Sequence, residues 1–139
     1  MVRYVAAIAI ASFMGMISLP SLAQQRQTPK PNVQGDYNSA ITKFPDGSKA
    51  VLLSWFTNIR NGRLNCRSAP GVNQRIIQQF QPNDLIQVDA GANNSQELIV
   101  RDSQGNPWLR VKIVNNQGQS HRNCFVRANR QFIEPNSLE

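Results

Sequence analysis

Residues 62–71 read GRLNCRSAPG, and this segment decides the fold that we expect. A short stretch of alternating apolar and polar residues leads into a turn that contains proline and glycine. The segment also carries Cys66, one of only two cysteines in the 139-residue chain. The second, Cys124, lies near the far end in the sequence NCFVR. A bond between the two sulfurs would close residues 66–124 into one compact unit.

Short strands separated by turns are expected after this point. The turns carry Pro82-Asn83 and the sequence DSQGNP at residues 102–107. No stretch repeats its apolar residues with the 3.6-residue period of a helix. Closely spaced short strands with such turns are typical of a small antiparallel barrel, so we expect an all-β fold. The expected strands cover residues 64–67, 75–80, 84–89, 97–101, 108–114, 124–127 and 132–133.

The first 23 residues have the pattern of a secretory signal peptide. Arg3 supplies the positive start, residues 5–19 are nearly all apolar, and Ser21-Leu22-Ala23 offers small residues to a signal peptidase. An apolar run of about 15 residues is too short to span a bilayer comfortably. We expect cleavage after Ala23, with no stable membrane span afterwards; an uncleaved N-terminal anchor is the alternative.

Two segments separate the signal from the expected barrel. Residues 24–35 contain Gln, two prolines and no apolar periodicity, which indicates a flexible linker. Residues 36–56 are expected to form an N-terminal β extension, either a hairpin or a turn at Pro45-Asp46-Gly47 followed by a strand. The sequence leaves open whether this extension belongs to the barrel or decorates it. The apolar run AVLLSWFT at residues 50–57 indicates one strand buried on both sides. The barrel then covers residues 57–135, and residues 136–139 form a tail.

The segment WLRVKI, residues 108–113, shows how the strand side chains divide between two faces. Successive residues of a strand point to opposite faces of the sheet. Arg110 and Lys112 therefore share one face with Trp108, and that face points outward. The core face carries the apolar set of Leu109, Val111 and Ile113.

The same alternation places both cysteines on the core side. Cys66 shares a face with Leu64, and Cys124 shares a face with Val126. Two cysteines in an exported chain most simply form one disulfide, so we expect a Cys66–Cys124 bond inside the barrel. Two buried free thiols are the alternative.

The outward face is the candidate ligand-binding surface because it combines aromatic rings with cations. Such a face can stack on sugars or peptides and pair with carboxylates or phosphates. Alternatively, Arg67 bonds local carbonyls and Trp108 packs under a loop, and one β-bulge would reverse the assignment of faces. The candidate residues are Asn65, Arg67, Trp108, Arg110, Lys112, Phe125 and Arg127.

Several of these segments resemble a bacterial SH3 (SH3b) domain. That family commonly opens with Leu-Asn-Val-Arg-Ser-x-Pro, which stands here as LNCRSAP at residues 64–70 with Cys66 in the valine position. Short strands at residues 75–77 and 84–88 follow in the family's order. A Trp-led strand is matched at 108–113, the usual Gly-Trp-Val is replaced by Cys124-Phe125-Val126, and FIEP at 132–135 resembles the closing segment.

The resemblance covers about residues 57–135 and implies a small SH3-like barrel that serves as a binding module. Members of the family are often directed at peptidoglycan or peptides. The two positions where cysteine departs from the family pattern fall on elements that pair in that fold, which fits the expected disulfide. A cell-wall target for this chain is an analogy from the family.

Charge and composition restrict the expected partners. The formal net charge is +7, and +6 without Arg3, which suits anionic wall polymers, lipopolysaccharide or phospholipid head groups. Export argues against a role on chromosomal DNA, so no nucleic acid partner is expected. The alternative is that the charge only aids solubility.

No constellation of catalytic or metal-binding residues is apparent in the sequence. The only histidine, His121, falls in a polar stretch at residues 117–123 that we expect to be a loop. The carboxylates are scattered, and two cysteines without close spacing plus one histidine do not make a typical zinc site. We therefore expect no enzyme, no metal and no cofactor.

Together these observations predict an exported, non-catalytic binding module in the periplasm or outside the cell. Its ligand would be peptidoglycan or another envelope peptide or polymer. The alternative is an accessory or inhibitor subunit that binds another envelope protein through the apolar segment 50–56, with Trp55 as the contact. The sequence leaves the oligomeric state open.

Overall fold

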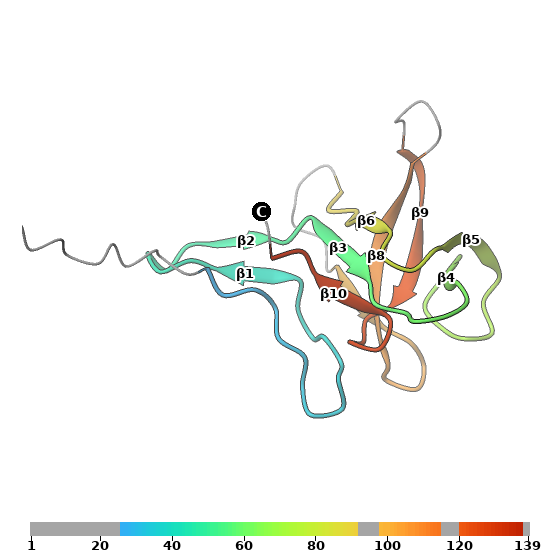
Figure 1. Cartoon of the computed structure of the whole chain (residues 1–139), viewed down its shortest axis with the longest axis horizontal. Helices are drawn as coiled ribbons and strands as arrows, with labels where there is room; N and C mark the ends of the chain where they lie inside the picture. Colours follow the sequence, from blue (N-terminus) through green and yellow to red (C-terminus); the bar gives the residue numbers. More distant parts are fainter. Residues whose placement is uncertain (1–25, 92–97, 115–119, 138–139) are drawn as a thin grey trace, which may run out of the picture.

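The computed structural model describes residues 26–91, 98–114 and 120–137, and within these ranges the chain is all-β, as predicted (Figure 1). The predicted signal peptide lies outside them. No helix in the described ranges is long and apolar enough to cross a membrane. The strands are β1 (Ile41–Lys43), β2 (Lys49–Val51), β3 (Ser54–Thr57), β4 (Leu64–Arg67), β5 (Ile76–Phe80), β6 (Leu85–Gln87), β7 (Ile99–Arg101), β8 (Pro107–Val114), β9 (Ser120–Arg127) and β10 (Ile133–Pro135).

The strands form three antiparallel sheets. The largest has the order β5-β4-β9-β8-β7, the second has the order β10-β3-β6, and β1 pairs with β2. Within the described part of the chain these sheets do not close into one barrel, which corrects the predicted architecture. The first two sheets meet at an isolated bridge between Val88 and Val111, because the chain after β6 reaches the edge of β8 for only one residue pair. The result is two open sheets packed around one core.

The core is lined by alternate residues of the predicted strands, and it contains the predicted disulfide. Cys66 and Cys124 are joined, with 5.5 Å between their Cα atoms, and both side chains are fully buried. Leu109 and Val111 on β8 and Val126 on β9 are fully buried too. The predicted inward parity is therefore confirmed. A register shift between Cys66 and Arg67 does not reverse it.

The N-terminal hairpin forms where the turn was expected. Gly47 has a φ of +85°, which a glycine adopts without strain, and the backbone N–H of Ser48 donates to Oδ1 of Asp46 at 2.8 Å. The predicted single strand at residues 50–57 is wrong, because β2 ends at Val51 and β3 begins at Ser54. The intervening Leu53 is 52% exposed, so the apolar run bends out of the core instead of continuing through it.

Residues 36–56, which the sequence left open as part of the barrel or as a decoration of it, contribute side chains to the core. Strand β3 crosses the predicted boundary at residue 57 and pairs with β6 on one side and β10 on the other. Trp55 is fully buried, and the ring of Tyr37 meets it edge-on, with 4.9 Å between ring centroids. Trp55 is therefore not available as a partner contact. The β1–β2 hairpin projects from the body (Figure 1).

The described part of the expected linker, residues 26–35, is held against the fold. Gln27 forms backbone hydrogen bonds in both directions with Lys43. Gly35 has a φ of +87°, and a Cβ there would lie 3.0 Å from Cγ of Arg130. Its carbonyl accepts a backbone hydrogen bond from Arg130 at 2.8 Å. These are hydrogen bonds between backbone groups, so the side-chain composition of the segment did not predict them.

Strand β9 begins at Ser120, so the predicted polar loop at residues 117–123 is wrong for its second half. Residues 120–123 pair with the end of β8 in a long hairpin. His121 lies in the strand, and its side chain is outside the described part of the structure.

Candidate functional site

Three of the predicted site residues form a row across the large sheet. Arg67 on β4 lies opposite Phe125 on β9, and Phe125 lies opposite Arg110 on β8. Residues directly opposite in an antiparallel sheet share a face, with Cβ atoms about 4.5–5.5 Å apart. All three side chains are half-buried. We call this set the Arg–Phe–Arg row.

The guanidinium of Arg67 is held by its own loop. Its Nη1 donates to the carbonyl of Gln74 at 2.7 Å, which is the local contact considered as an alternative role. A guanidinium has five N–H donors, so this bond fixes its position without using most of its capacity. Beside it, Oδ1 of Asn65 accepts from Nε2 of Gln79 at 2.8 Å. Arg67 is thus positioned by its loop, and Asn65 is tied to the neighbouring strand.

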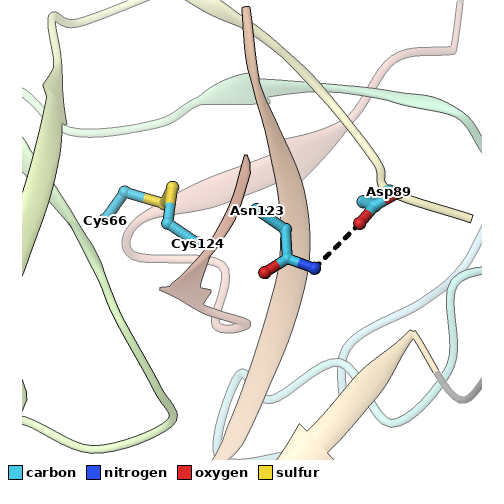
Figure 2. The surroundings of a disulfide bond; sticks show 4 residues. All are labelled: Cys66, Asp89, Asn123 and Cys124. Atoms are coloured by element: carbon cyan, nitrogen blue, oxygen red, sulfur yellow. Dashed lines mark hydrogen bonds between the residues drawn. A yellow bond between two sulfur atoms is a disulfide. The ribbon is translucent and has the colours of Figure 1, made fainter. Parts of the chain in front are cut away.

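Arg110 is positioned by the chain that follows β6. Its Nε donates to the carbonyl of Asp89 at 3.3 Å. The carboxylate of Asp89 accepts from Nδ2 of Asn123 at 3.0 Å. Figure 2 shows this contact beside the disulfide, with the side chains of Asn123 and Cys124 leaving β9 on opposite sides. Strand β9 therefore contributes Cys124 to the core on one side, and on the other side it holds Asp89 through Asn123.

Arg127 has a structural role that the sequence did not suggest. Its Nη2 lies 2.7 Å from Oδ1 of Asp36 in an ion pair, and its Nη1 donates to the carbonyl of Pro107 at 2.9 Å. Asp36 is also bound by Nδ2 of Asn129 at 2.8 Å. These contacts tie the N-terminal segment to β9, so the positive charge of Arg127 is largely neutralised within the fold.

Trp108 lies on the expected face of β8 but is covered. The side chain is only 2% exposed, and it stands outside the cluster of buried residues that forms the main core. Its Nε1 donates to Oδ2 of Asp102 at 2.9 Å. The expectation of a ligand-stacking tryptophan is therefore wrong, and the alternative of packing under a loop is correct. Parity assigns a face to a side chain but does not show what covers that face.

The Asp102 carboxyl organises the turn that covers Trp108. Burial alone would raise its pKa, but hydrogen bonds from the Trp108 indole, the Asn106 side chain and the backbones of Asn106 and Gln104 lower it from 3.8 to about 2. Charged Asp102 therefore stabilises the fold fully above pH 3.8, and this contribution disappears as the pH falls through about 2.

Replacing Asp102 with Asn is expected to lower the free energy of unfolding by about 1 kcal/mol at neutral pH, after discounting for solvent screening. The difference from wild type should shrink as the pH falls from about 4 to 2, because wild-type Asp102 then loses its charge as well. Urea unfolding at several pH values measures this. A difference that stays constant down to pH 2 would contradict the role assigned to the carboxylate.

Lys112 lies one step along the sheet from the row. It lines a groove of about 380 Å³ between the strand edges, together with Phe80 and Ile86. Leu85, which is half exposed, lines the same groove. Lys112 is therefore close to an apolar surface that the sequence did not predict.

The structure also contains a second cleft that the sequence did not predict. We call it the tyrosine cleft. Its volume is about 550 Å³, and it lies where the chain after β3, the turn before β10 and the N-terminal segment meet. These pieces lie far apart in the sequence, so no local pattern brought them together. Its polar lining residues are Tyr37, Asn58, Arg60, Arg130, Gln131 and Glu134.

Within the described residues, no three His, Cys, Asp or Glu side chains gather in a way that could hold a metal ion. Comparison with models of protein families, with curated proteins and with solved structures gave no significant match. The resemblance to bacterial SH3 domains therefore rests alone on the ordered sequence motifs between residues 64 and 135.

Proposed function

We propose that this chain is an exported, non-catalytic binding protein of SH3b-like design, and that it recognises peptidoglycan or another anionic polymer of the cell envelope. The observation that carries the proposal is the Arg–Phe–Arg row, which sets an aromatic ring between two cations on one sheet face. A ring of this kind stacks on the apolar face of a sugar, and guanidinium groups pair with carboxylates or phosphates.

The row is well suited to binding because its members are fixed before a ligand arrives. Arg67 and Arg110 are held by the carbonyls of Gln74 and Asp89. On the other side of the same strands, the buried Cys66–Cys124 bond joins β4 to β9. A surface that is already ordered loses less conformational entropy on binding.

Two observations support an exported location, in the periplasm or outside the cell. The predicted signal peptide would direct the chain out of the cytoplasm. The disulfide is compatible with an oxidising compartment. Because both cysteines are oxidised, neither supplies a thiolate for nucleophilic catalysis.

Co-sedimentation of the secreted protein with purified peptidoglycan tests the proposal. We expect retention at low salt that weakens as the ionic strength rises, because exposed charges are screened. Phe125→Ala or Arg67→Gln should each weaken binding by about tenfold, the usual effect of losing one central contact. Near-UV circular dichroism would verify that each variant is folded.

Lys49→Gln is the matched control, because it removes one positive charge from the projecting hairpin, away from the row. It should bind almost as tightly as the wild type. Absence of retention at low salt, or equal weakening by Lys49→Gln and Arg67→Gln, would reject the proposal. Equal weakening would mean that net charge alone drives adsorption.

A second candidate function is that of an accessory or inhibitor subunit for another envelope protein. It is favoured by β5 and β6, which are both edge strands of their sheets and carry the exposed side chains of Ile76 and Leu85. A partner segment in extended conformation could add a strand to the edge of β5. Co-purification of one stoichiometric partner, lost on Ile76→Lys but retained on Arg67→Gln, would favour this function over polymer binding.

A further inference from the structure

The tyrosine cleft has charged groups of both signs on its walls. Arg60 and Arg130 supply two guanidinium groups, and Glu134 on β10 supplies a carboxylate. The side-chain amides of Asn58 and Gln131 add neutral donors and acceptors. A volume of about 550 Å³ lies within the range of small-molecule sites.

Tyr37 provides a fixed floor for this cleft. Its ring is held edge-on by the buried indole of Trp55, and the residue is only 3% exposed. Burial raises the pKa of the Tyr37 hydroxyl, the charge of Glu134 raises it further, and the charge of Arg130 opposes the rise. The hydroxyl therefore lies within the electrostatic reach of both charged groups, and it remains a neutral donor.

The walls of the cleft are tied together by hydrogen bonds. Nδ2 of Asn58 donates to the carbonyl of Arg130 at 2.6 Å, and the backbone N–H of Asn58 donates to the carbonyl of Phe132 at 2.8 Å. On the other side, the N–H of Arg130 donates to the carbonyl of Gly35 at 2.8 Å. Three segments distant in sequence are thus held at fixed separation.

The charged groups themselves are not used by the fold. In residues 26–91, 98–114 and 120–137, the side chains of Arg60, Arg130 and Glu134 take part in no ion pair and no side-chain hydrogen bond. This contrasts with Arg127, which is neutralised by Asp36. Hydrogen bonds to backbone carbonyls hold the walls of the cleft in place, and its charged side chains are exposed.

We infer that the tyrosine cleft binds a small zwitterion, such as an amino acid or an intact dipeptide. The ligand's carboxylate pairs with the guanidinium groups of Arg60 and Arg130, and its ammonium group pairs with Glu134. Glu134 disfavours a second anionic group in the cleft, so a zwitterion suits the lining better than a polyanion does. The site is thus chemically different from the Arg–Phe–Arg row and does not depend on polymer binding there.

Three related dipeptides separate the contributions of the ligand's carboxylate and ammonium group to binding in the cleft. Alanyl-alanine carries both charges, its N-acetyl derivative keeps only the carboxylate, and its C-terminal amide keeps only the ammonium group. Ligand-observed NMR titration of the full secreted protein would give a Kd for each. We expect alanyl-alanine to bind at least about tenfold more tightly than either derivative, because each derivative loses one charge-assisted contact.

Two variants assign the contacts to residues. Glu134→Gln should bind alanyl-alanine and its N-acetyl derivative almost equally, because the partner of the ammonium group is gone. Arg60→Gln should weaken alanyl-alanine by about tenfold. Arg67→Gln, which removes the same kind of charge from the sheet face, should leave all three Kd values unchanged.

Equal affinity for the three dipeptides, or wild-type affinity in both Arg60→Gln and Glu134→Gln, would overturn the inference. The absence of saturable binding of alanyl-alanine up to about 10 mM would also overturn the inference, because a site that forms two charge pairs should have a Kd below about 10 mM. Peptidoglycan retention without any dipeptide binding would reject the cleft and leave the proposed function intact. Dipeptide binding without peptidoglycan retention would reject the proposed function and leave the inference about the cleft intact.

Discussion

Replacing both cysteines, as Cys66→Ala with Cys124→Ala, is expected to lower the free energy of unfolding by about 4 kcal/mol. The bond joins residues separated by 58 positions, so its removal frees a long loop in the unfolded chain. A domain of this size has a total stability of about 5–15 kcal/mol, which makes the expected loss a large share of it. Guanidinium unfolding of the oxidised wild type and of the double variant measures the difference.

The wild type unfolded in the presence of a reductant is the matched control, and its stability should approach that of the double variant. The fully buried position of both sulfurs predicts that reduction follows unfolding and does not precede it. A double variant within about 1 kcal/mol of the oxidised wild type, less than native disulfides usually contribute, would contradict the structural weight given to the bond.

Trp55→Ala is expected to lower the free energy of unfolding by about 3–5 kcal/mol, which is typical for truncation of a large buried aromatic side chain. The indole is fully buried, contacts Tyr37, and donates from Nε1 to the carbonyl of Leu52 at 3.3 Å. Its strand pairs with β6 and β10, so its loss should weaken the whole fold and not only the N-terminal segment. Thermal and urea unfolding would measure the effect.

Leu53→Ala is the control for Trp55→Ala, because Leu53 lies two residues away and is half exposed. It should change the free energy of unfolding by less than about 0.5 kcal/mol. Hydrogen exchange adds a second readout. If Trp55→Ala exposed only residues 36–57 to exchange and left β8 and β9 fully protected, the N-terminal segment would be a separate unit after all.

The alternation of residues along β4, β8 and β9 was enough to predict which of their side chains face the core, and with the two-cysteine count it predicted the disulfide. It placed Cys66 and Cys124 on the inner face, and it placed Arg67, Arg110 and Phe125 together on the outer face. Such predictions succeed because the period of a strand is fixed by backbone geometry and does not depend on partners distant in sequence.

The sequence failed where long-range contacts decide the outcome. Composition indicated a linker at residues 24–35, but the described part is held by backbone bonds to Lys43 and Arg130, which composition cannot reveal. The run AVLLSWFT was expected to be one strand, but it is interrupted at Leu53. Its first part, β2, pairs with β1, whereas its second part, β3, pairs with β6 and β10. Trp108 was placed on the correct face, but the sequence could not decide between a ligand-stacking role and packing under a loop, and the structure shows the second.

The tyrosine cleft could not have been predicted from local patterns. Tyr37, Arg60 and Arg130 lie far apart in the chain, and the pairing of β3 with β10 is what brings Arg60 and Arg130 close together. The one available signal was the accumulation of cations in the polar loop at residues 58–63, next to a strand end. The cleft could be recognised only once the fold was known.

The most direct test of the central claim is a map of the surface that contacts an envelope polymer. Soluble peptidoglycan fragments would be titrated into the ¹⁵N-labelled protein while backbone amide shifts are recorded. We predict that the largest shifts fall on β4, β9 and β8 around Arg67, Phe125 and Arg110, and that Phe125→Ala removes them. Shifts confined to the β1–β2 hairpin, or no shifts at all, would contradict the claim that the Arg–Phe–Arg row is the binding surface.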